Sequence, residues 1–288
     1  MALGPNDLVL CSGTVARQTP LRDRLGAASA AGFGGISLWG RDYRAAREEG
    51  FDDSEIASLI ADHGLAVAEL DPAWWWTPGA AAVHIPPEAD PVDVFRYGED
   101  EVLRIAEVLG ARSINAVDVL GGSYGPAEAA EGFARLCDRA ADHGLLVHLE
   151  WLAWSKIPDL ATARAIVDMA ERPNGGLTVD VWHCVRTDTA PAEIATLPGR
   201  LVASIQLSDG PAQPEPELVT ATLHHRQLPG HGEFDLAGYL RALRSTGTEA
   251  PVGVEIFSDD LHRLGATEAA RRAAEATRAV LEAARSPA

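Results

Sequence analysis

Lysine and long apolar runs are both scarce in this chain of 288 residues. Lys156 is the only lysine, and 24 Lys and Arg stand against 42 Asp and Glu, giving a net charge of −18 at pH 7. Because an acidic surface repels phosphate backbones, we expect no nucleic-acid partner. No run reaches the roughly 18 apolar residues that a membrane span needs, and the first residues lack the pattern of a signal peptide. We therefore expect no membrane association.

Cysteine is also rare. Cys11, Cys137 and Cys184 are scattered, odd in number and form no CxxC motif. This pattern argues against a disulfide framework and is typical of a reducing compartment. We expect a cytoplasmic protein.

What the chain does have is a regular alternation of short apolar runs with Ala-, Leu- and Arg-rich segments. The hydrophobic content of 47% and charged content of 23% are ordinary for a globular protein. The apolar runs predict strands with both faces buried, and the segments between them predict helices. The expected strands are residues 7–14, 35–40, 65–74, 113–119, 145–151, 176–183, 201–209 and 251–257.

Eight strands alternating strictly with eight helices predict a parallel sheet, and this number of units favours a closed barrel. We therefore expect an α/β fold, a single (β/α)8 TIM barrel that occupies residues 1–288 as one domain. An open doubly wound sheet is the alternative, but no GxGxxG motif follows the first strand. The Pro-rich connection at 77–91 exceeds the usual loop length and is expected to be a functional lid or a disordered tip.

Oxygen-bearing side chains end the last four expected strands. Glu150 ends the fifth strand, Asp180 the sixth, Gln206 lies near the end of the seventh, and Glu255 near the end of the eighth. The carboxyl ends of barrel strands form the usual site of catalysis, so these side chains should meet. Three carboxylates in one place would repel each other without a cation. Oxygen ligands favour Mn²⁺, Mg²⁺ or Co²⁺, and His183 could contact either the metal or a substrate.

This pattern resembles the xylose isomerase-like barrel superfamily, on the glutamate after strand five, the DVWH motif, the RQLPGHG segment and the final glutamate. The resemblance implies one divalent metal ion held by Glu150, Asp180, Gln206 and Glu255. It implies that Glu150 and Glu255 are catalytic and move a proton next to a carbonyl, through an enediolate that the metal stabilises. It also implies that His183, as a further catalytic residue, and Arg226 contact substrate oxygens.

The resemblance makes an isomerase or epimerase acting on a keto-sugar or polyol the leading interpretation. A metal-dependent dehydratase or lyase, acting on a cyclic polyol, a dehydroshikimate-like acid or a glycoside, is the alternative. Gln206 stands where many epimerases have histidine, and this keeps elimination open. A non-catalytic sugar-binding barrel is a third interpretation. The superfamily often forms dimers and tetramers, which makes a homo-oligomer compatible with this chain.

All seven tryptophans fall at or just after expected strand ends. One interpretation is an aromatic-walled pocket for a bulky or partly apolar substrate, such as a glycoside-like molecule, in which Trp75, Trp151 and Trp182 bind the substrate. The other is simple packing beneath long loops, since each indole buries a large area. Because lysine is so rare, phosphorylated substrates are not favoured. His148, two residues before Glu150, is expected to be a core histidine and not a ligand.

Overall fold

A computed structural model describes residues 2–83, 85, 95–119 and 122–285. Eight parallel strands close into a barrel in sequence order, β1 to β8, which confirms the predicted (β/α)8 fold. Of the long connection expected at 77–91, residues 84 and 86–91 lie outside the described residues. Within the described part of the chain, no helix is long and apolar enough to cross a membrane.

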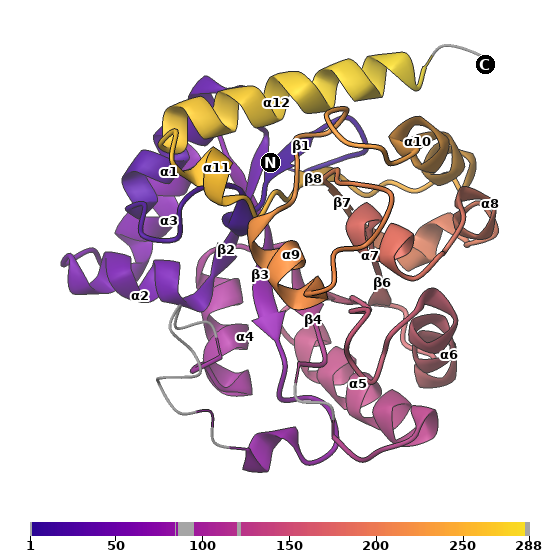
Figure 1. Ribbon diagram of the computed structural model, residues 1–288. Helices are drawn as coiled ribbons and strands as arrows, with labels where there is room; N and C mark the ends of the chain where they lie inside the picture. Colours follow the sequence, from indigo (N-terminus) through magenta and orange to yellow (C-terminus); the bar gives the residue numbers. More distant parts are fainter. Residues whose placement is uncertain (1, 84, 86–94, 120–121, 286–288) are drawn as a thin grey trace.

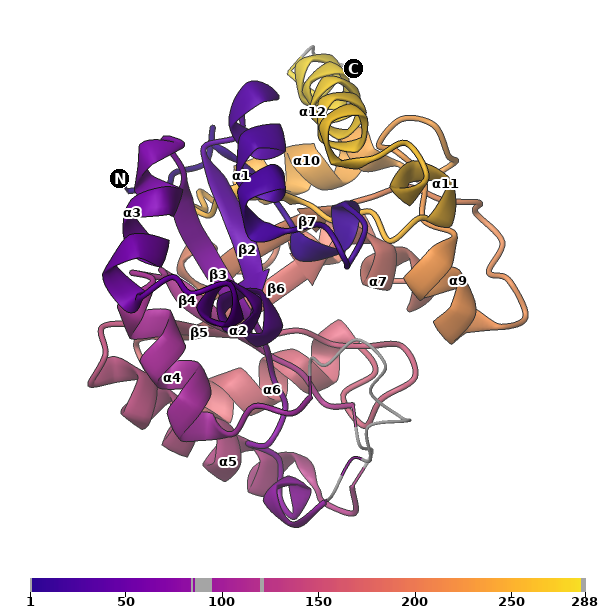
Figure 2. The same cartoon turned by 90° about the vertical axis from the view of Figure 1, so that its left-hand side faces the viewer.

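The strands are short, and helices surround them (Figure 1). The strands are β1 Leu8–Leu10, β2 Gly35–Trp39, β3 Ala66–Ala73, β4 Ser113–Ala116, β5 Leu146–Leu149, β6 Gly175–Asp180, β7 Val202–Leu207 and β8 Val252–Val254. The helices are α1 Leu21–Ala30, α2 Gly40–Glu48, α3 Asp53–Asp62, α4 Glu99–Val108, α5 Pro126–Ala141, α6 Leu160–Ala170, α7 Val181–Arg186, α8 Pro191–Ile194, α9 Leu218–His224, α10 Leu236–Ser245, α11 Asp259–His262 and α12 Ala266–Ala283. Figure 2 shows α1 and α12 side by side, so the first and last helices meet and complete the ring.

Alternation along each strand separates the core into two parts. On β7, Ile205 and Leu207 belong to the large apolar core between strands and helices, whereas Ser204 is polar and its Oγ reaches Glu69 of β3 at 3.0 Å. Since β3 and β7 are not neighbours in the barrel, this hydrogen bond crosses its interior. The barrel interior therefore contains polar side chains, while Val9, Cys11 and Ala68 form a small apolar cluster apart from the large core.

The predicted strict alternation of one helix with each strand is wrong in detail. Two helices follow β2, β6, β7 and β8, and the short helices α2, α7, α9 and α11 did not stand out in the sequence. The strand expected at 176–183 ends at Asp180, because the Asp180 side chain accepts a hydrogen bond from Trp182 N and caps α7. His183 therefore lies on a helix and not on the strand.

Candidate active site

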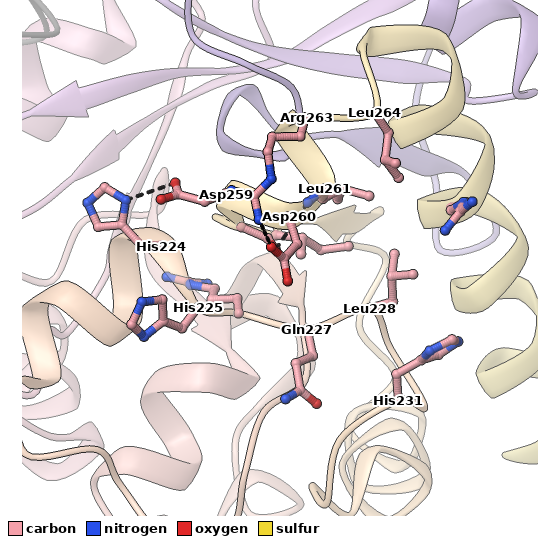
Figure 3. A pocket seen from close by; sticks show the side chains of 14 residues that line it. His224, His225, Gln227, Leu228, His231, Asp259, Asp260, Leu261, Arg263 and Leu264 are labelled. Carbon is pink, nitrogen blue, oxygen red and sulfur yellow. Dashed lines mark hydrogen bonds and ion pairs between the residues drawn. The ribbon is translucent and has the colours of Figure 1, made fainter.

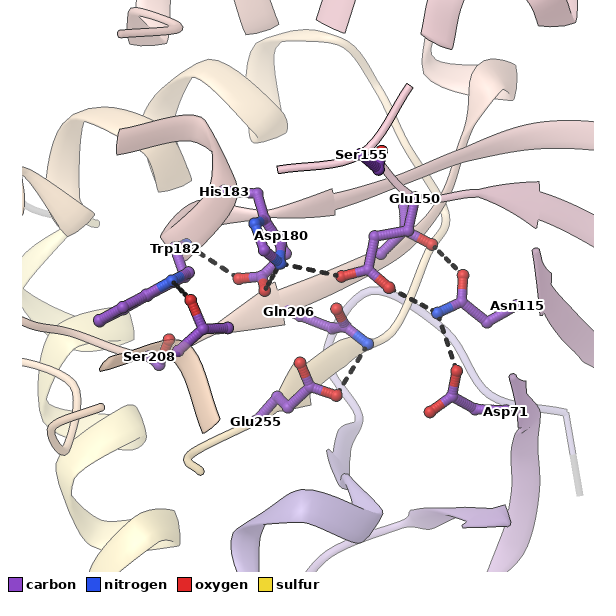
Figure 4. A network of polar contacts seen from close by, with 12 residues as sticks. Asp71, Asn115, Glu150, Ser155, Asp180, Trp182, His183, Gln206, Ser208 and Glu255 are labelled. Atoms are coloured by element: carbon purple, nitrogen blue, oxygen red, sulfur yellow. Dashed lines mark hydrogen bonds and ion pairs between the residues drawn. The ribbon is translucent and has the colours of Figure 1, made fainter. Parts of the chain in front are cut away.

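The four predicted strand-end residues converge at the carboxyl ends of β5 to β8. Glu150 directly follows β5, Asp180 is the last residue of β6, Gln206 lies in β7 and Glu255 directly follows β8. All four are buried, with exposed fractions between 1% and 6%. Figure 4 shows their side chains turned toward one shared space, together with His183.

His183 joins this group from the first turn of α7. Its Nε2 lies 3.7 Å from Glu150 Oε1 and 3.7 Å from Asp180 Oδ2. One ligand atom from each of Glu150, Asp180 and His183 lies within 4.8 Å of the others. Gln206 Nε2 donates to Glu255 Oε1 at 3.3 Å, which ties the remaining pair together.

Arg226 provides the positive charge beside these acids. Its Nη1 donates to Asp180 Oδ2 at 2.8 Å and to Glu255 Oε2 at 3.2 Å, and its Nε donates to Thr222 O. The side chain is 2% exposed. Burial alone would lower the pKa of Arg226, but the charges of Asp180, Glu255 and Glu150 outweigh it and raise the pKa. Arg226 is therefore a fixed cation.

The single positive charge of Arg226 does not balance the negative charges of three buried carboxylates. Burial, and then the charges of Glu255 and Asp180, raise the pKa of Glu150 well above its ordinary value. Burial likewise raises the pKa of Glu255 well above its ordinary value and raises that of Asp180, although Arg226 opposes both shifts. The protein alone thus favours protonation of these acids, which is the electrostatic condition that a bound cation would relieve.

The donor set fits a divalent metal ion. Gln206 Oε1 is buried and has no hydrogen-bond partner among the described residues, although a buried carbonyl oxygen normally has one. Figure 4 shows this oxygen on the side of Asp180 and Glu150. Three carboxylates and one free amide oxygen match the oxygen ligands that hard divalent ions prefer. Glu150, Asp180, Gln206 and Glu255 would hold such an ion.

His183 is neutral in this environment. Burial lowers its pKa well below the ordinary value, and the charges of Arg226 and Arg186 lower it further. Its Nδ1 is buried without a hydrogen-bond partner among the described residues. The indole of Trp154 packs edge-on against the imidazole, with ring centroids 5.4 Å apart. A neutral imidazole held this way can accept a proton or a hydrogen bond.

A polar network beneath the site was not predicted from the sequence. Asn115 of β4 donates through Nδ2 to Glu150 Oε2 at 2.6 Å and to Asp71 Oδ1 at 3.1 Å. His148 is fully buried, and both of its ring nitrogens have partners, Ser113 on one side and Thr178 on the other, which confirms it as a core histidine. The spacing of Glu69 and Asp71 in AELDPA was the available signal for them, because residues two apart lie on the same face of a strand.

Asp71 gives a prediction about pH. Burial and the charge of Glu69 raise its pKa from 3.8 to about 7. A carboxyl whose pKa is raised on folding contributes stability that is fully present below the unfolded pKa and is lost as the pH rises toward the folded pKa. We therefore expect Asp71→Asn to flatten the fall in the free energy of unfolding between pH 4 and pH 7 for the metal-free protein. Urea unfolding across this range measures it, and an unchanged slope would contradict the assignment.

Six of the seven tryptophans are buried, and Trp154 is the exception with 37% exposure. Trp75 Nε1 donates to Tyr97 O, and Trp182 Nε1 donates to Thr222 Oγ1. Trp151 is fully buried. Any role for Trp75, Trp151 and Trp182 in substrate binding therefore works through the residues that they hold, such as Arg226, whose Cζ lies 5.3 Å from the Trp182 ring.

A hollow of about 840 Å³ lies between α9, α11 and α12 (Figure 3). Arg226 lines this hollow and also contacts Asp180 of the candidate site. Two of the hollow's histidines already contact carboxylates, since His224 pairs with Asp259 and His225 pairs with Glu215. In the described residues, Glu150, Asp180 and His183 form the one group with metal-ligand geometry, and this hollow contains none of them. Among the described residues, the hollow thus shares Arg226 with the candidate site but none of the three carboxylates.

The structure is thus a closed (β/α)8 barrel with acids and an amide gathered at the carboxyl ends of its last four strands. The chain belongs to the family described as the xylose isomerase-like TIM barrel, whose model matches residues 25–282. This confirms the resemblance drawn from the sequence.

Sequence relatives within this family are enzymes. The chain is 30% identical over 254 residues to a 3-dehydroshikimate dehydratase of Pseudomonas aeruginosa, a match that covers 85% of this chain and 37% of that protein. It is 28% identical over 154 residues to an inosose isomerase of Bacillus velezensis, covering 53% of this chain and 54% of that protein. The chain thus matches little more than a third of the dehydratase and about half of the isomerase.

Solved structures show the same fold. The IOLI protein with a bound zinc atom superposes with a TM-score of 0.80 at 18% identity, covering 98% of this chain and all of that one. A D-allulose 3-epimerase from Methylomonas sp. in complex with D-allulose gives a TM-score of 0.68 at 17% identity, covering 97% of this chain and 99% of that one. At identities of 18% and 17%, these neighbours show that the fold is shared.

Proposed function

We propose that this protein is a divalent-metal-dependent enzyme that removes a proton next to the carbonyl of a cyclic hydroxy-ketone and eliminates water from it. The observation that carries the metal-dependent chemistry is the unpartnered oxygen of Gln206 amid three carboxylates whose pKa values are raised. The choice of elimination rests on the dehydratase similarity, which extends over 85% of the chain.

Each residue has a role that follows from its position. A bound divalent ion, Mn²⁺, Mg²⁺ or Co²⁺, would polarise the substrate carbonyl as a Lewis acid. Glu150 and Glu255 come from different strands and offer carboxylates on two sides of the shared space, so one can take a proton from carbon. His183, neutral and close to Glu150, accepts or returns a proton at a substrate oxygen. Arg226 holds Asp180 and Glu255 in place.

Isomerisation is the second candidate, since the inosose isomerases match about half of the chain and the epimerase shares its fold. Both reactions begin with the same proton removal, and they differ in whether a neighbouring hydroxyl then leaves. The geometry of the acids serves either outcome. A keto-sugar or polyol would be the substrate in this second case.

One experiment separates the candidates. The metal-free protein is loaded with Mn²⁺ and incubated in deuterated water with 3-dehydroshikimate, the compound in the relatives' name, and separately with inosose and D-allulose. NMR and mass spectrometry then follow the substrate. Loss of water supports the proposal, and deuterium uptake without mass loss of water supports isomerisation. Bound metal with neither change for any of these compounds would favour a sugar-binding barrel.

Trp154 gives a prediction about substrate binding. Its partly exposed indole covers His183, so a ring-shaped substrate would pack against it. Aromatic packing of this kind is worth about 1 kcal/mol, so we expect Trp154→Ala to raise KM about fivefold with a smaller change in kcat. Trp154→Phe is the matched control and should stay close to wild type. A fall in kcat at constant KM would assign Trp154 to positioning His183 instead.

A further inference from the structure

Gln206 poses a problem of orientation that a carboxylate ligand does not have. An amide presents oxygen at one end and NH2 at the other, and a metal accepts the oxygen alone. In the structure Nε2 faces Glu255 Oε1 at 3.3 Å and Glu69 Oε1 at 3.4 Å, while Oε1 is left without a partner. Both carboxylates thus accept hydrogen bonds from the NH2 end of the amide, and this orientation leaves its oxygen end facing the site.

These two carboxylates are not equivalent. Glu255 is itself a proposed ligand of the ion. Glu69 lies deeper in the barrel on β3, is 3% exposed, and makes no hydrogen bond to Glu150, Asp180 or Glu255 among the described contacts. Glu69 can therefore hold the Gln206 amide without competing for the ion.

Glu69 is itself held in place by other contacts. Its Oε2 accepts from Ser204 Oγ at 3.0 Å and lies 3.2 Å from His148 Nε2. Residues of β5 and β7 therefore fix the carboxylate whose Oε1 faces Gln206.

We propose that Glu69 is the positioning residue that makes Gln206 a metal ligand, by accepting a hydrogen bond from its amide and so aiming Oε1 at the ion. This inference rests on the proposed metal site. It assigns to a buried acid of β3, far from the four strand ends in sequence, a role in metal affinity that no strand-end pattern indicates.

The test is Mn²⁺ binding by the purified metal-free protein, followed by calorimetry, in a double-mutant cycle. We expect Glu69→Gln to weaken Mn²⁺ binding about tenfold or more, because the new amide can offer NH2 to Gln206 and let it turn. In a Gln206→Glu background the same change should alter Kd by less than about threefold, because a carboxylate presents oxygen at both ends. Glu215→Gln is the matched control: it makes the same acid-to-amide change at an exposed carboxylate that pairs with His225, and it should leave Kd within about twofold.

The possible results distinguish the positioning role of Glu69 from the proposed metal site itself. Equal Mn²⁺ affinity in wild type and Glu69→Gln would overturn the positioning role and leave the proposed metal site intact. An equal loss in both backgrounds would also overturn it, since it would show that the charge of Glu69 matters and the orientation of Gln206 does not. No Mn²⁺ binding by the wild type would overturn the proposed function together with this inference. If Glu69→Gln does not fold, Glu69→Asp withdraws the carboxylate from Gln206 and should weaken binding in the same direction.

Discussion

Replacing Glu150 with glutamine should lower turnover by about 10³-fold or more, because it removes a proton acceptor and puts a neutral, weaker amide oxygen in place of a charged ligand of the proposed ion. Glu150 is 6% exposed and lies between Asn115 and His183, so no neighbouring acid can move into its place without losing its own partners. The stabilisation that added Mn²⁺ gives to the wild type should be largely lost. Steady-state kinetics and thermal unfolding with and without Mn²⁺ measure both effects.

Without metal, Glu150→Gln should not lower the free energy of unfolding, in contrast to its loss of stabilisation by Mn²⁺. Since the pKa of Glu150 is raised well above its ordinary value, ionising this group at pH 8 costs folding free energy, and a neutral amide avoids that cost. We expect metal-free Glu150→Gln to be at least as stable as metal-free wild type at pH 8. Glu215→Gln, an exposed acid that pairs with His225, is the control and should change neither activity nor metal response. A Glu150→Gln variant with full turnover would refute the site.

The candidate site could be read from the sequence because its residues follow apolar runs. Glu150 comes after VHL and Glu255 after VGV, so each marks the end of a strand in a fold where all strand ends meet at one rim. Local pattern and barrel topology were enough to bring four distant residues together. The alternation of strands and helices predicted that topology for the same reason.

The layer below the rim could not be read in this way. Glu69 lies within an apolar run, and its partners His148 and Ser204 come from strands on other sides of the barrel. Which face of β3 turns inward depends on the register of barrel closure, and the sequence does not state that register. Helices α9 and α11 were missed because they are only 7 and 4 residues long, too short to show a helical repeat of apolar residues.

The exposure of the tryptophans could not be predicted from the sequence either. Their positions after strands were plain in the sequence, but exposure depends on what covers each ring. Phe133 packs against Trp76, and Phe234 packs against Trp182, so aromatic partners from α5 and from the segment before α10 cover rings that might otherwise face the solvent. Trp154 is 37% exposed in the described part of the chain, and the Trp154→Ala variant tests whether this indole contacts a substrate.

Replacing His183 with glutamine should lower turnover about 10²-fold while leaving Mn²⁺ affinity within about threefold of wild type. The structure places His183 Nε2 3.7 Å from both Glu150 and Asp180, so the imidazole could serve as a ligand in place of Gln206. One feature argues for proton transfer instead. Gln206 already offers an unpartnered oxygen to the same space, so the ion has a fourth ligand without the imidazole.

Metal affinity and turnover measured on one preparation decide between these roles. A ligand and a proton carrier both reduce turnover when removed, but the loss of a ligand also weakens metal binding. If His183→Gln loses Mn²⁺ in parallel with activity while Gln206→Leu retains it, the ligand set is Glu150, Asp180, His183 and Glu255. If Mn²⁺ stays bound and turnover falls, His183 acts on the substrate, and the four strand ends hold the metal without help from α7.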